Sequence, residues 1–398
     1  MMGHSAGNRR LIMMMMALIV LTPMGVDIFL PSLPMLAQDF ALDTAGIKWS
    51  ITLYLISMGA GQLVAGPLVD ALGRRPMAMA GALVYGLAAG LCLVADQITL
   101  FYIGRLMQGF GASLATVVAF SCVRDRFEGE RRAGIYSFLN AAVCVVPALA
   151  PLLGSVLAAF WHWRASFVFM VAFALGVTLF CLWGLEETRP PGRRKNHWSR
   201  YGHDVLAILR DGHFVFHAMI AMTGMTVILI YVTTAPILLI DQAGLSELAF
   251  GGWFGAVAAI NVLSYFLAPR LIARLGQQRA IHAGLAIMVA GGVFHGLFYS
   301  LVGPGVATFM LPNAVMVTGF SLTLGAALSL ALEPYADRAG LASSLAGCCQ
   351  MGGGALLASL LTLLPLPPQW MLALTGVLGA GGLLLAAILV FHRHPTVS

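Results

Sequence analysis

The chain alternates between long apolar runs and short polar segments. Apolar runs of about 20 residues recur, and a helix of that length crosses the roughly 30 Å hydrocarbon core of a bilayer. One polar stretch is long, residues 186–212, and it divides the apolar runs six and six. The pattern therefore predicts an all-α membrane protein. We expect twelve transmembrane helices near residues 11–33, 47–69, 77–95, 98–122, 134–160, 164–185, 214–240, 250–269, 280–302, 305–332, 339–364 and 369–391.

A weak internal repeat supports a division into halves. Residues 132–139 read RAGIYSFL and residues 338–345 read RAGLASSL, so five of eight positions agree at an offset of 206. The Leu-Gly pair at 72–73 recurs at 275–276, offset 203. Chance matching in an apolar chain is the alternative. Parallel repeats are common in transporters, and we expect two six-helix pseudo-repeats. Their predicted bounds are 1–185 and 214–398, joined by a cytoplasmic linker at 186–213.

Composition supports the membrane assignment and excludes other classes. Sixty per cent of the 398 residues are apolar and 10% are charged, whereas a soluble domain has about 25% charged residues. The formal charge of +6 comes from short loops rather than a basic stripe, so we expect no nucleic-acid partner. All six cysteines lie in or beside apolar runs, which argues against a disulfide framework or a metal site. The first apolar run has no cleavage site and is predicted to be a retained span.

The distribution of basic residues predicts the orientation. If both ends of the chain lie on one side, that side carries 19 of the 22 Lys and Arg residues. The other side keeps only Lys48 and Arg164, and Arg105 falls inside a span. The positive-inside rule makes the basic side cytoplasmic. A miscounted span would have spread these charges over both sides, so the tally also favours an even number of helices.

Two charged residues lie clearly within predicted spans. An ionisable side chain in the hydrocarbon region costs at least about 2.5–3.5 kcal/mol, so such residues are functional candidates. Asp27 lies roughly 24 Å along the first span, and Arg105 lies about 10 Å from the outer end of the fourth. Their similar depth would let them approach if both helices face one cavity. Pro31 and Pro34 should loosen the backbone near Asp27.

The pair suggests proton exchange. Burial disfavours a charged carboxylate and a nearby cation favours it, so Asp27 can gain and lose a proton as a cavity opens and closes. A static Asp27–Arg105 pair that only fixes helix packing is the alternative. Other polar groups within spans line a cavity or bond between helices, and Gln108 is favoured because it lies one turn beyond Arg105. These groups are Tyr54, Gln62, Gln108, Asn140, Tyr231, Asn261, His295, Asn313 and Gln350.

Three short motifs follow one another in the first half. Residues 66–75 read GPLVDALGRR, where Gly73 permits a tight turn. Asp70 lies at a helix C-terminus, where the dipole disfavours a negative charge, so it should need a partner. Residues 105–111 read RLMQGFG, and residues 147–154 read PALAPLLG. The small and helix-bending residues of the last motif, which are Pro147, Pro151 and Gly154, should allow close contact and flexing.

In this order the motifs resemble signatures of the major facilitator superfamily. VDIFLPSLP at 26–34 and LASSLAG at 341–347 resemble its Bcr/CflA group of bacterial drug–proton antiporters, which includes chloramphenicol-type exporters. The resemblance covers nearly the whole chain. It implies a twelve-helix rocker in the bacterial cytoplasmic membrane, with a central cavity between two halves.

The resemblance also implies roles for residues. Asp27 would match a first-span carboxylate used for protons and cationic drugs, and Arg105 a fourth-span arginine essential to coupling. Asp70 would join Arg124 and the start of the eleventh span in a cytoplasmic latch. The candidate substrate-binding residues are Asp27, Tyr54, Gln108, Asn140 and Tyr231. The candidate gate residues are Gly66, Asp70, Gly73, Arg74, Arg75 and Arg124.

One departure bears on stoichiometry. Some relatives carry a second carboxylate about two turns earlier in the first span, where this chain has Ile19 and Val20. One carboxylate predicts one proton per cycle. Exchange of one proton for a neutral drug would then move net charge, at about 2.3 kcal/mol per charge per 100 mV, whereas exchange for a monocation would be electrically silent.

We therefore expect proton-coupled efflux of lipophilic neutral or cationic drugs, in a monomer surrounded by lipid. The proton gradient drives it, with no cofactor. An uptake or efflux carrier for a small metabolite, such as a nucleoside or sugar, is the alternative in the same fold. A sensor or scaffold would need a signalling domain or a long tail. An enzyme would need paired acids, a metal cluster or a nucleophile–base pair within the spans, and the sequence offers none.

Overall fold

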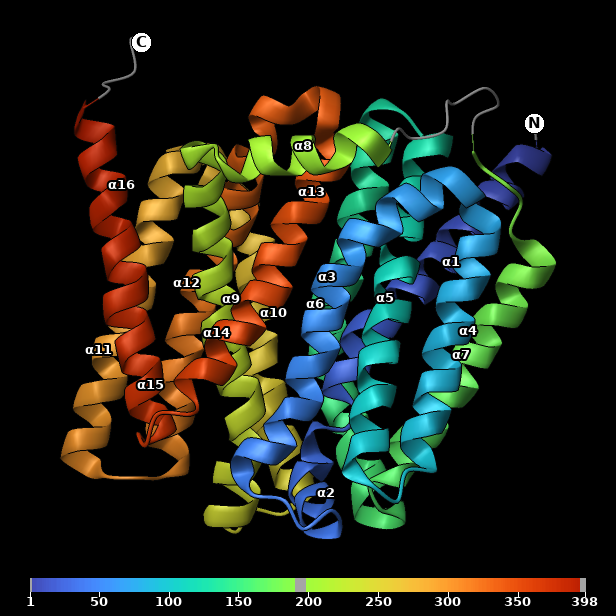
Figure 1. The fold of residues 1–398 in the computed structure, drawn as a ribbon. Coiled ribbons are helices and arrows are strands. Elements are labelled where there is room, and N and C mark those ends of the chain that lie inside the picture. Colours follow the sequence, from blue (N-terminus) through green and yellow to red (C-terminus); the bar gives the residue numbers. More distant parts are fainter. Residues whose placement is uncertain (1, 190–197, 394–398) are drawn as a thin grey trace. The chain divides into compact units, whose positions relative to one another are not determined.

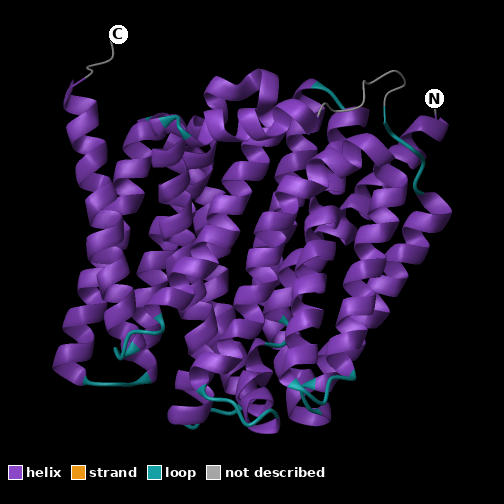
Figure 2. Ribbon diagram, in the orientation of Figure 1, coloured by secondary structure: helices purple, strands orange, loops and turns teal. Residues whose placement is uncertain are grey.

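The computed structural model describes residues 2–189 and 198–393 (Figure 1). Helices dominate this part of the chain, and no strand occurs in it (Figure 2). In the first half the elements are α1 (Met2–Asp27), the 3₁₀ turn η1 (Leu30–Ser32), α2 (Leu33–Asp39), α3 (Thr44–Leu72), α4 (Arg74–Leu93), α5 (Ile98–Arg126), α6 (Gly129–Trp161) and α7 (Arg164–Gly184). The later elements are α8 (Trp198–Leu209), α9 (Gly212–Pro236), η2 (Ile237–Gln242), α10 (Glu247–Leu275), α11 (Gln277–Val302), α12 (Val306–Leu332), η3 (Glu333–Arg338), α13 (Ala339–Gly347), η4 (Cys348–Gly353), α14 (Gly354–Leu361), α15 (Pro368–Leu374), η5 (Thr375–Ala380) and α16 (Gly381–Arg393).

The predicted spans all correspond to helical segments. Over the described residues, eleven helical runs are long and apolar enough to cross a membrane, and α6 contributes a shorter apolar helix, Val145–Trp161. The prediction of an all-α, multi-pass membrane protein is confirmed. The first span is longer than predicted, because the helical run continues past a break to Asp39. The spans of the second half contain the π-helical segments η2, η4 and η5.

The predicted linker contains a helix that its polar composition concealed. α8 places Trp198, Tyr201, Val205 and Ile208 at helical spacing, which is the pattern of an amphipathic helix. Arg193, Arg194 and Lys195, which we assigned to the same linker, lie outside the described residues.

Contacts divide the chain into two compact units. The first comprises Met1–Gly202 with Ser246–Gly255, and the second comprises His203–Leu245 with Ala256–Ser398. The expected halves, 1–185 and 214–398, stay a prediction.

In the first unit α5 is the central helix and packs against α1, α3 and α4. Glycines bring these backbones together. An ideal Cβ at Gly111 would lie 2.6 Å from the Tyr85 nitrogen, and one at Gly109 would lie 2.1 Å from the Tyr54 carbonyl oxygen. Real Cβ atoms do not approach so closely, so these positions need glycine. These glycines therefore bring α5 close to the backbones of α3 and α4.

The second unit uses the same device. α12 packs against α11 and α9, and a Cβ at Gly284 would lie 2.7 Å from the Gly319 carbonyl oxygen. Small residues at the contact replace the hydrophobic driving force that lipid cannot supply. Polar pairs add to it, for example Ser321, whose hydroxyl donates to the Asn261 amide oxygen at 2.5 Å.

Candidate functional site

The first span breaks at Asp27. Pro31 has no N–H, so the Asp27 carbonyl has no donor four residues later, and Pro34 does the same to the Leu30 carbonyl. α1 ends at Asp27, the chain turns, and the helical path resumes through η1 and α2. The predicted loosening of the backbone near Asp27 is confirmed. The break leaves a carboxylate at a helix end within the span.

Arg105 on α5 is fully buried and is bound mainly by backbone carbonyls. Its Nε donates to the Ser50 carbonyl at 2.9 Å, and its Nη2 donates to the Gly25 carbonyl at 2.7 Å. Its Nη1 donates to the side-chain oxygen of Gln108, one turn along the same helix face. These bonds connect α5 to α3 and to α1.

Two aromatic rings complete the Arg105 site. The guanidinium carbon lies 4.6 Å from the ring centroid of Phe29 and 4.6 Å from that of Tyr54. A guanidinium is weakly hydrated and stacks well on aromatic faces. Carbonyls and rings therefore replace the water that Arg105 gave up, and no carboxylate of the described residues pairs with it.

Asp27 is 5% exposed. Among the described residues, no hydrogen-bond donor and no cation pairs with its carboxyl group. Arg105 binds the carbonyl of Gly25, two residues before Asp27, and the approach of the Asp27 and Arg105 side chains stays a prediction. The alternative of a direct, static Asp27–Arg105 ion pair finds no support in this structure.

The other predicted substrate-binding residues lie in two places. Tyr54 is fully buried and donates to the Thr22 carbonyl at 2.7 Å. Gln108 is fully buried, and its amide nitrogen lies 3.4 Å from the Met170 sulfur. Both therefore line the Asp27–Arg105 region. Tyr231 is buried in α9 beside Phe309, at 5.9 Å between ring centroids.

The side chain of Asn140 lies outside the described residues. The roles of Asp27, Tyr54, Gln108 and Tyr231 in substrate binding stay predictions.

The residues of the fifth-span motif lie in α6 and bring it against the α1 break. Pro147 and Pro151 stand inside the helix, and the Ser155 hydroxyl donates to the Pro151 carbonyl at 2.7 Å. Gly154 faces Ile28, the first residue after α1, so closely that an ideal Cβ would lie 1.8 Å from the Ile28 carbonyl oxygen. The close contact predicted for this motif is thus made with the broken helix.

The end of α2, the helix that follows the break, is also held in place. Asp39, the last residue of α2, accepts a hydrogen bond from the Trp163 indole at 2.7 Å and lies 3.5 Å from the Arg164 guanidinium. Trp163 is fully buried against Phe40 and Phe101. α2 is therefore tied to the start of α7.

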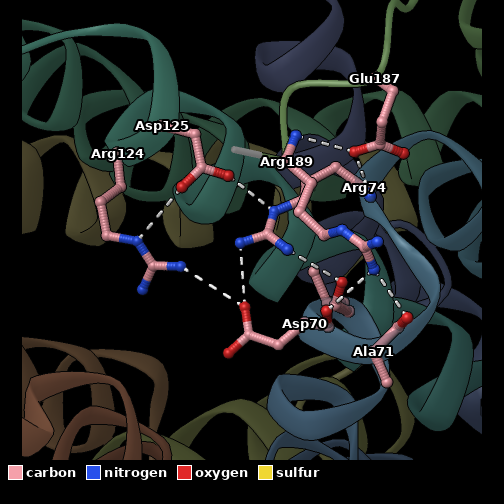
Figure 3. Close-up of polar contacts among 8 residues, drawn as sticks. Asp70, Ala71, Arg74, Arg124, Asp125, Glu187 and Arg189 are labelled. Atoms are coloured by element: carbon pink, nitrogen blue, oxygen red, sulfur yellow. Dashed lines mark hydrogen bonds and ion pairs between the residues drawn. The ribbon is translucent and has the colours of Figure 1, made fainter. Parts of the chain in front are cut away.

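The gate motif forms a separate charged cluster, which we call the Arg74 cluster (Figure 3). Arg74 is fully buried and donates to Asp70 at 2.9 Å and to Asp125 at 2.7 Å. Arg124 lies 3.8 Å from Asp70 and 3.7 Å from Asp125. Asp70 thus has the cationic partner that its position at a helix C-terminus requires. The predicted latch to the eleventh span stays a prediction.

A carboxylate from the linker region caps the next helix. Glu187 accepts the backbone N–H of Arg74 at 2.9 Å, at the first turn of α4 (Figure 3). It also accepts the backbone N–H of Arg75 at 3.2 Å. Partial burial alone would raise the pKa of Glu187, but the backbone N–H groups of Arg74, Arg189 and Arg75 outweigh it and hold the pKa below its ordinary value. The Arg189 guanidinium donates to the Ala71 carbonyl, near the end of α3, at 2.8 Å.

Glycine is required at the turn between α3 and α4. Gly73 has φ +102°, and a Cβ there would lie 2.5 Å from the Glu187 carboxylate. Gly66, by contrast, lies within α3 directly before Pro67. Arg75 is anchored outward, to the Leu182 carbonyl at 3.1 Å.

Sequence reasoning missed several members of these sites. Asp125 stands between two arginines at the end of α5, and that signal was readable. Glu187 belongs to an acidic pair at the start of the linker and gave a weaker signal. The carbonyls of Gly25 and Ser50 gave none, because every residue has one. The described residues contain no group of three or more His, Cys, Asp or Glu side chains that could hold a metal ion.

Comparison with known proteins agrees with the fold. The family model described as Major Facilitator Superfamily matches residues 15–358. The chain is 32% identical to the multidrug resistance protein MdtL of Shigella dysenteriae and 33% identical to MdtL of Citrobacter koseri, each over 85% of both chains.

Solved structures show the same architecture. A D-xylose–proton symporter superimposes with a TM-score of 0.76 at 17% identity, over 94% of this chain and 96% of that one. The human organic anion transporter MFSD10 superimposes with a TM-score of 0.69 at 17% identity, over 96% and 99%. At these identities the likeness concerns the fold alone. The family match and the MdtL relatives go further, and with the motifs placed as described, they show that this chain belongs to the major facilitator superfamily.

Proposed function

We propose that the protein exports lipophilic neutral or cationic drugs in exchange for protons, by alternating access. The observation that carries the proposal is the state of Asp27. Its carboxyl group is buried in a membrane span, at a helix break, without an ion pair among the described residues. A charge there is costly, so the group is suited to take up a proton when closed off and to release it when water or a cationic drug enters.

The relatives named multidrug resistance protein support the substrate class. The surroundings of Arg105 support it too, because the rings of Phe29 and Tyr54 lie against its guanidinium and both residues are fully buried. Such a lining suits lipophilic molecules better than sugars, which need many hydrogen-bond partners. We place the protein in the bacterial cytoplasmic membrane with both termini inside, as a monomer, with one proton exchanged per cycle.

Proton release from purified protein in weakly buffered detergent tests the proposal. Phenicols, lipophilic cationic dyes and nucleosides would be added in turn, and the pH change recorded. We expect release by phenicols or dyes, and none from Asp27→Asn. Asp96→Asn is the matched control, because Asp96 is a carboxylate whose side chain is 91% exposed, and it should behave as wild type.

Two results would contradict the proposal. Release that is unchanged in Asp27→Asn would remove Asp27 from the mechanism. Release by nucleosides or sugars alone, together with proton-driven uptake in proteoliposomes, would favour the metabolite carrier instead.

A further inference from the structure

The carbonyl of Ile28, the first residue after α1, lacks the hydrogen bond that a continuous helix would give it. Ile28 is fully buried directly after Asp27, and its N–H still donates to the Met24 carbonyl at 3.4 Å. The N–H of Ser32, which would serve the Ile28 carbonyl in a continuous helix, donates instead to Phe29 at 2.9 Å. The break therefore leaves an acceptor beside Asp27 that other helices must satisfy.

Two other helices meet this carbonyl. Ser166, in the first turn of α7, is fully buried and donates its hydroxyl to the Ile28 oxygen at 3.3 Å. Gly154 of α6 packs against the same oxygen. An ideal Cβ at Gly154 would lie 1.8 Å from that oxygen and 2.7 Å from the carbonyl carbon, and an atom cannot be accommodated there unless the break moves.

Asp27 is thus held from both sides. Two residues before it, the Gly25 carbonyl accepts from Arg105. One residue after it, the Ile28 carbonyl accepts a hydrogen bond from Ser166 and packs closely against Gly154. Since Asp27 lies between these two contacts, its backbone is held by them.

We infer that Gly154 and Ser166 are positioning residues for Asp27, which fix the α1 break and so set the pH at which its carboxyl group gains a proton. The inference rests on the proposed function only for its consequence, that α6 and α7 control proton coupling. The contact also gives the α6 motif a role: a movement of α6 near Pro147 and Pro151 would displace the backbone next to the carboxylate.

The test follows the carboxyl group itself. The infrared C=O band of a protonated, buried carboxyl group is recorded against pH in purified protein and assigned to Asp27 by its loss in Asp27→Asn. In Gly154→Ala we expect the midpoint to move by at least about 0.5 pH unit, and in Ser166→Ala by a smaller amount. The pH midpoint of drug transport in proteoliposomes should move with it.

Two glycine variants serve as matched controls. Gly176→Ala lies on α7, where an added Cβ meets nothing within 4 Å. Gly81→Ala lies on α4, where a Cβ would come within 3.0 Å of α5 but away from α1. We expect neither to move the midpoint, although Gly81→Ala should lower thermal stability.

The inference is overturned if the band titrates in Gly154→Ala and Ser166→Ala as it does in wild type, even when transport is slower at every pH. If Gly154→Ala does not fold, Ser166→Ala decides, because it removes one hydroxyl and adds no bulk. If the Asp27 band shifts in these variants but the wild-type protein transports no drug, the proposed function is refuted and the positioning role stands.

Discussion

Two buried arginines of the first unit are bound by different kinds of groups. Arg105 and Arg74 are both fully buried. Arg105 is bound by two backbone carbonyls, a side-chain amide and two aromatic faces. Arg74 is bound by the carboxylates of Asp70 and Asp125. Within the part of the chain that the structure describes, the Arg105 guanidinium therefore pairs with no carboxylate, whereas that of Arg74 pairs with two.

The comparison distinguishes the Asp27–Arg105 region, where we propose that a carboxyl group titrates, from the Arg74 cluster, which holds helices together. The carboxylates around Arg74 are committed to ion pairs that join α3, α4 and α5. Among the described residues no carboxylate pairs with Arg105, and we propose that Asp27 is therefore left able to exchange a proton. Backbone carbonyls and the Gln108 amide accept the hydrogen bonds of Arg105. The Asp27 carboxyl group, which we propose to be functional, is therefore not needed as their acceptor.

Replacing Arg105 by lysine should have the largest effect. A lysine amine donates from a single point and does not stack as a guanidinium does, so it cannot bind Ser50, Gly25 and Gln108 together. We expect drug transport to fall about 100-fold, as misplaced catalytic groups commonly cost, with the protein still folded. Transport assays in proteoliposomes check this. Arg279→Lys, at an exposed side chain near the start of α11, is the control and should stay near wild type; equal losses in both would contradict the comparison.

Removing Arg74 should mainly affect stability. Arg74→Ala leaves Asp125, whose side chain is 3% exposed, without its closest cation, and breaking a buried pair costs about 3–5 kcal/mol. We expect the lower end, because Arg124 lies 3.7 Å from Asp125. Unfolding in detergent measures the loss, and Arg74→Ala with Asp125→Ala should recover part of it. Proton release at Asp27 should keep its pH midpoint; a shift as large as that in Gly154→Ala would show that the two sites are not separate.

The smallest expected effect is a pH-dependent one at Glu187. Its folded pKa lies below its ordinary value, so ionised Glu187 stabilises the fold above its unfolded pKa and loses that contribution as pH falls through the folded pKa. Because Glu187 is exposed, the contribution should stay below about 1 kcal/mol. The difference in thermal stability between wild type and Glu187→Gln should be present at neutral pH and vanish in acid. A difference independent of pH would mean that hydrogen bonding to α4 does not need the charge.

The predictable part of the site is the part that depends on single residues. Asp27 and Arg105 were identified because a charge within an apolar span is costly wherever it points. The break after Asp27 was predicted because Pro31 lacks an N–H in any fold. The gate motif was located by its glycine and charges, although its full set of partners was not.

The sequence by itself determined the all-α, multi-pass architecture, the basic bias of the loops and the position of the helix break, because these follow from hydrophobicity and backbone chemistry read along the chain. Only the tertiary structure decided that Arg105 binds the Gly25 carbonyl 80 positions away rather than Asp27, and that Glu187 caps a helix 113 positions before it. The same holds for Gly154 and Ile28. These pairings depend on how each helix is rotated about its axis and which neighbour it faces. In a chain that is apolar nearly all round, periodicity does not encode that rotation, and close packing of small residues settles it.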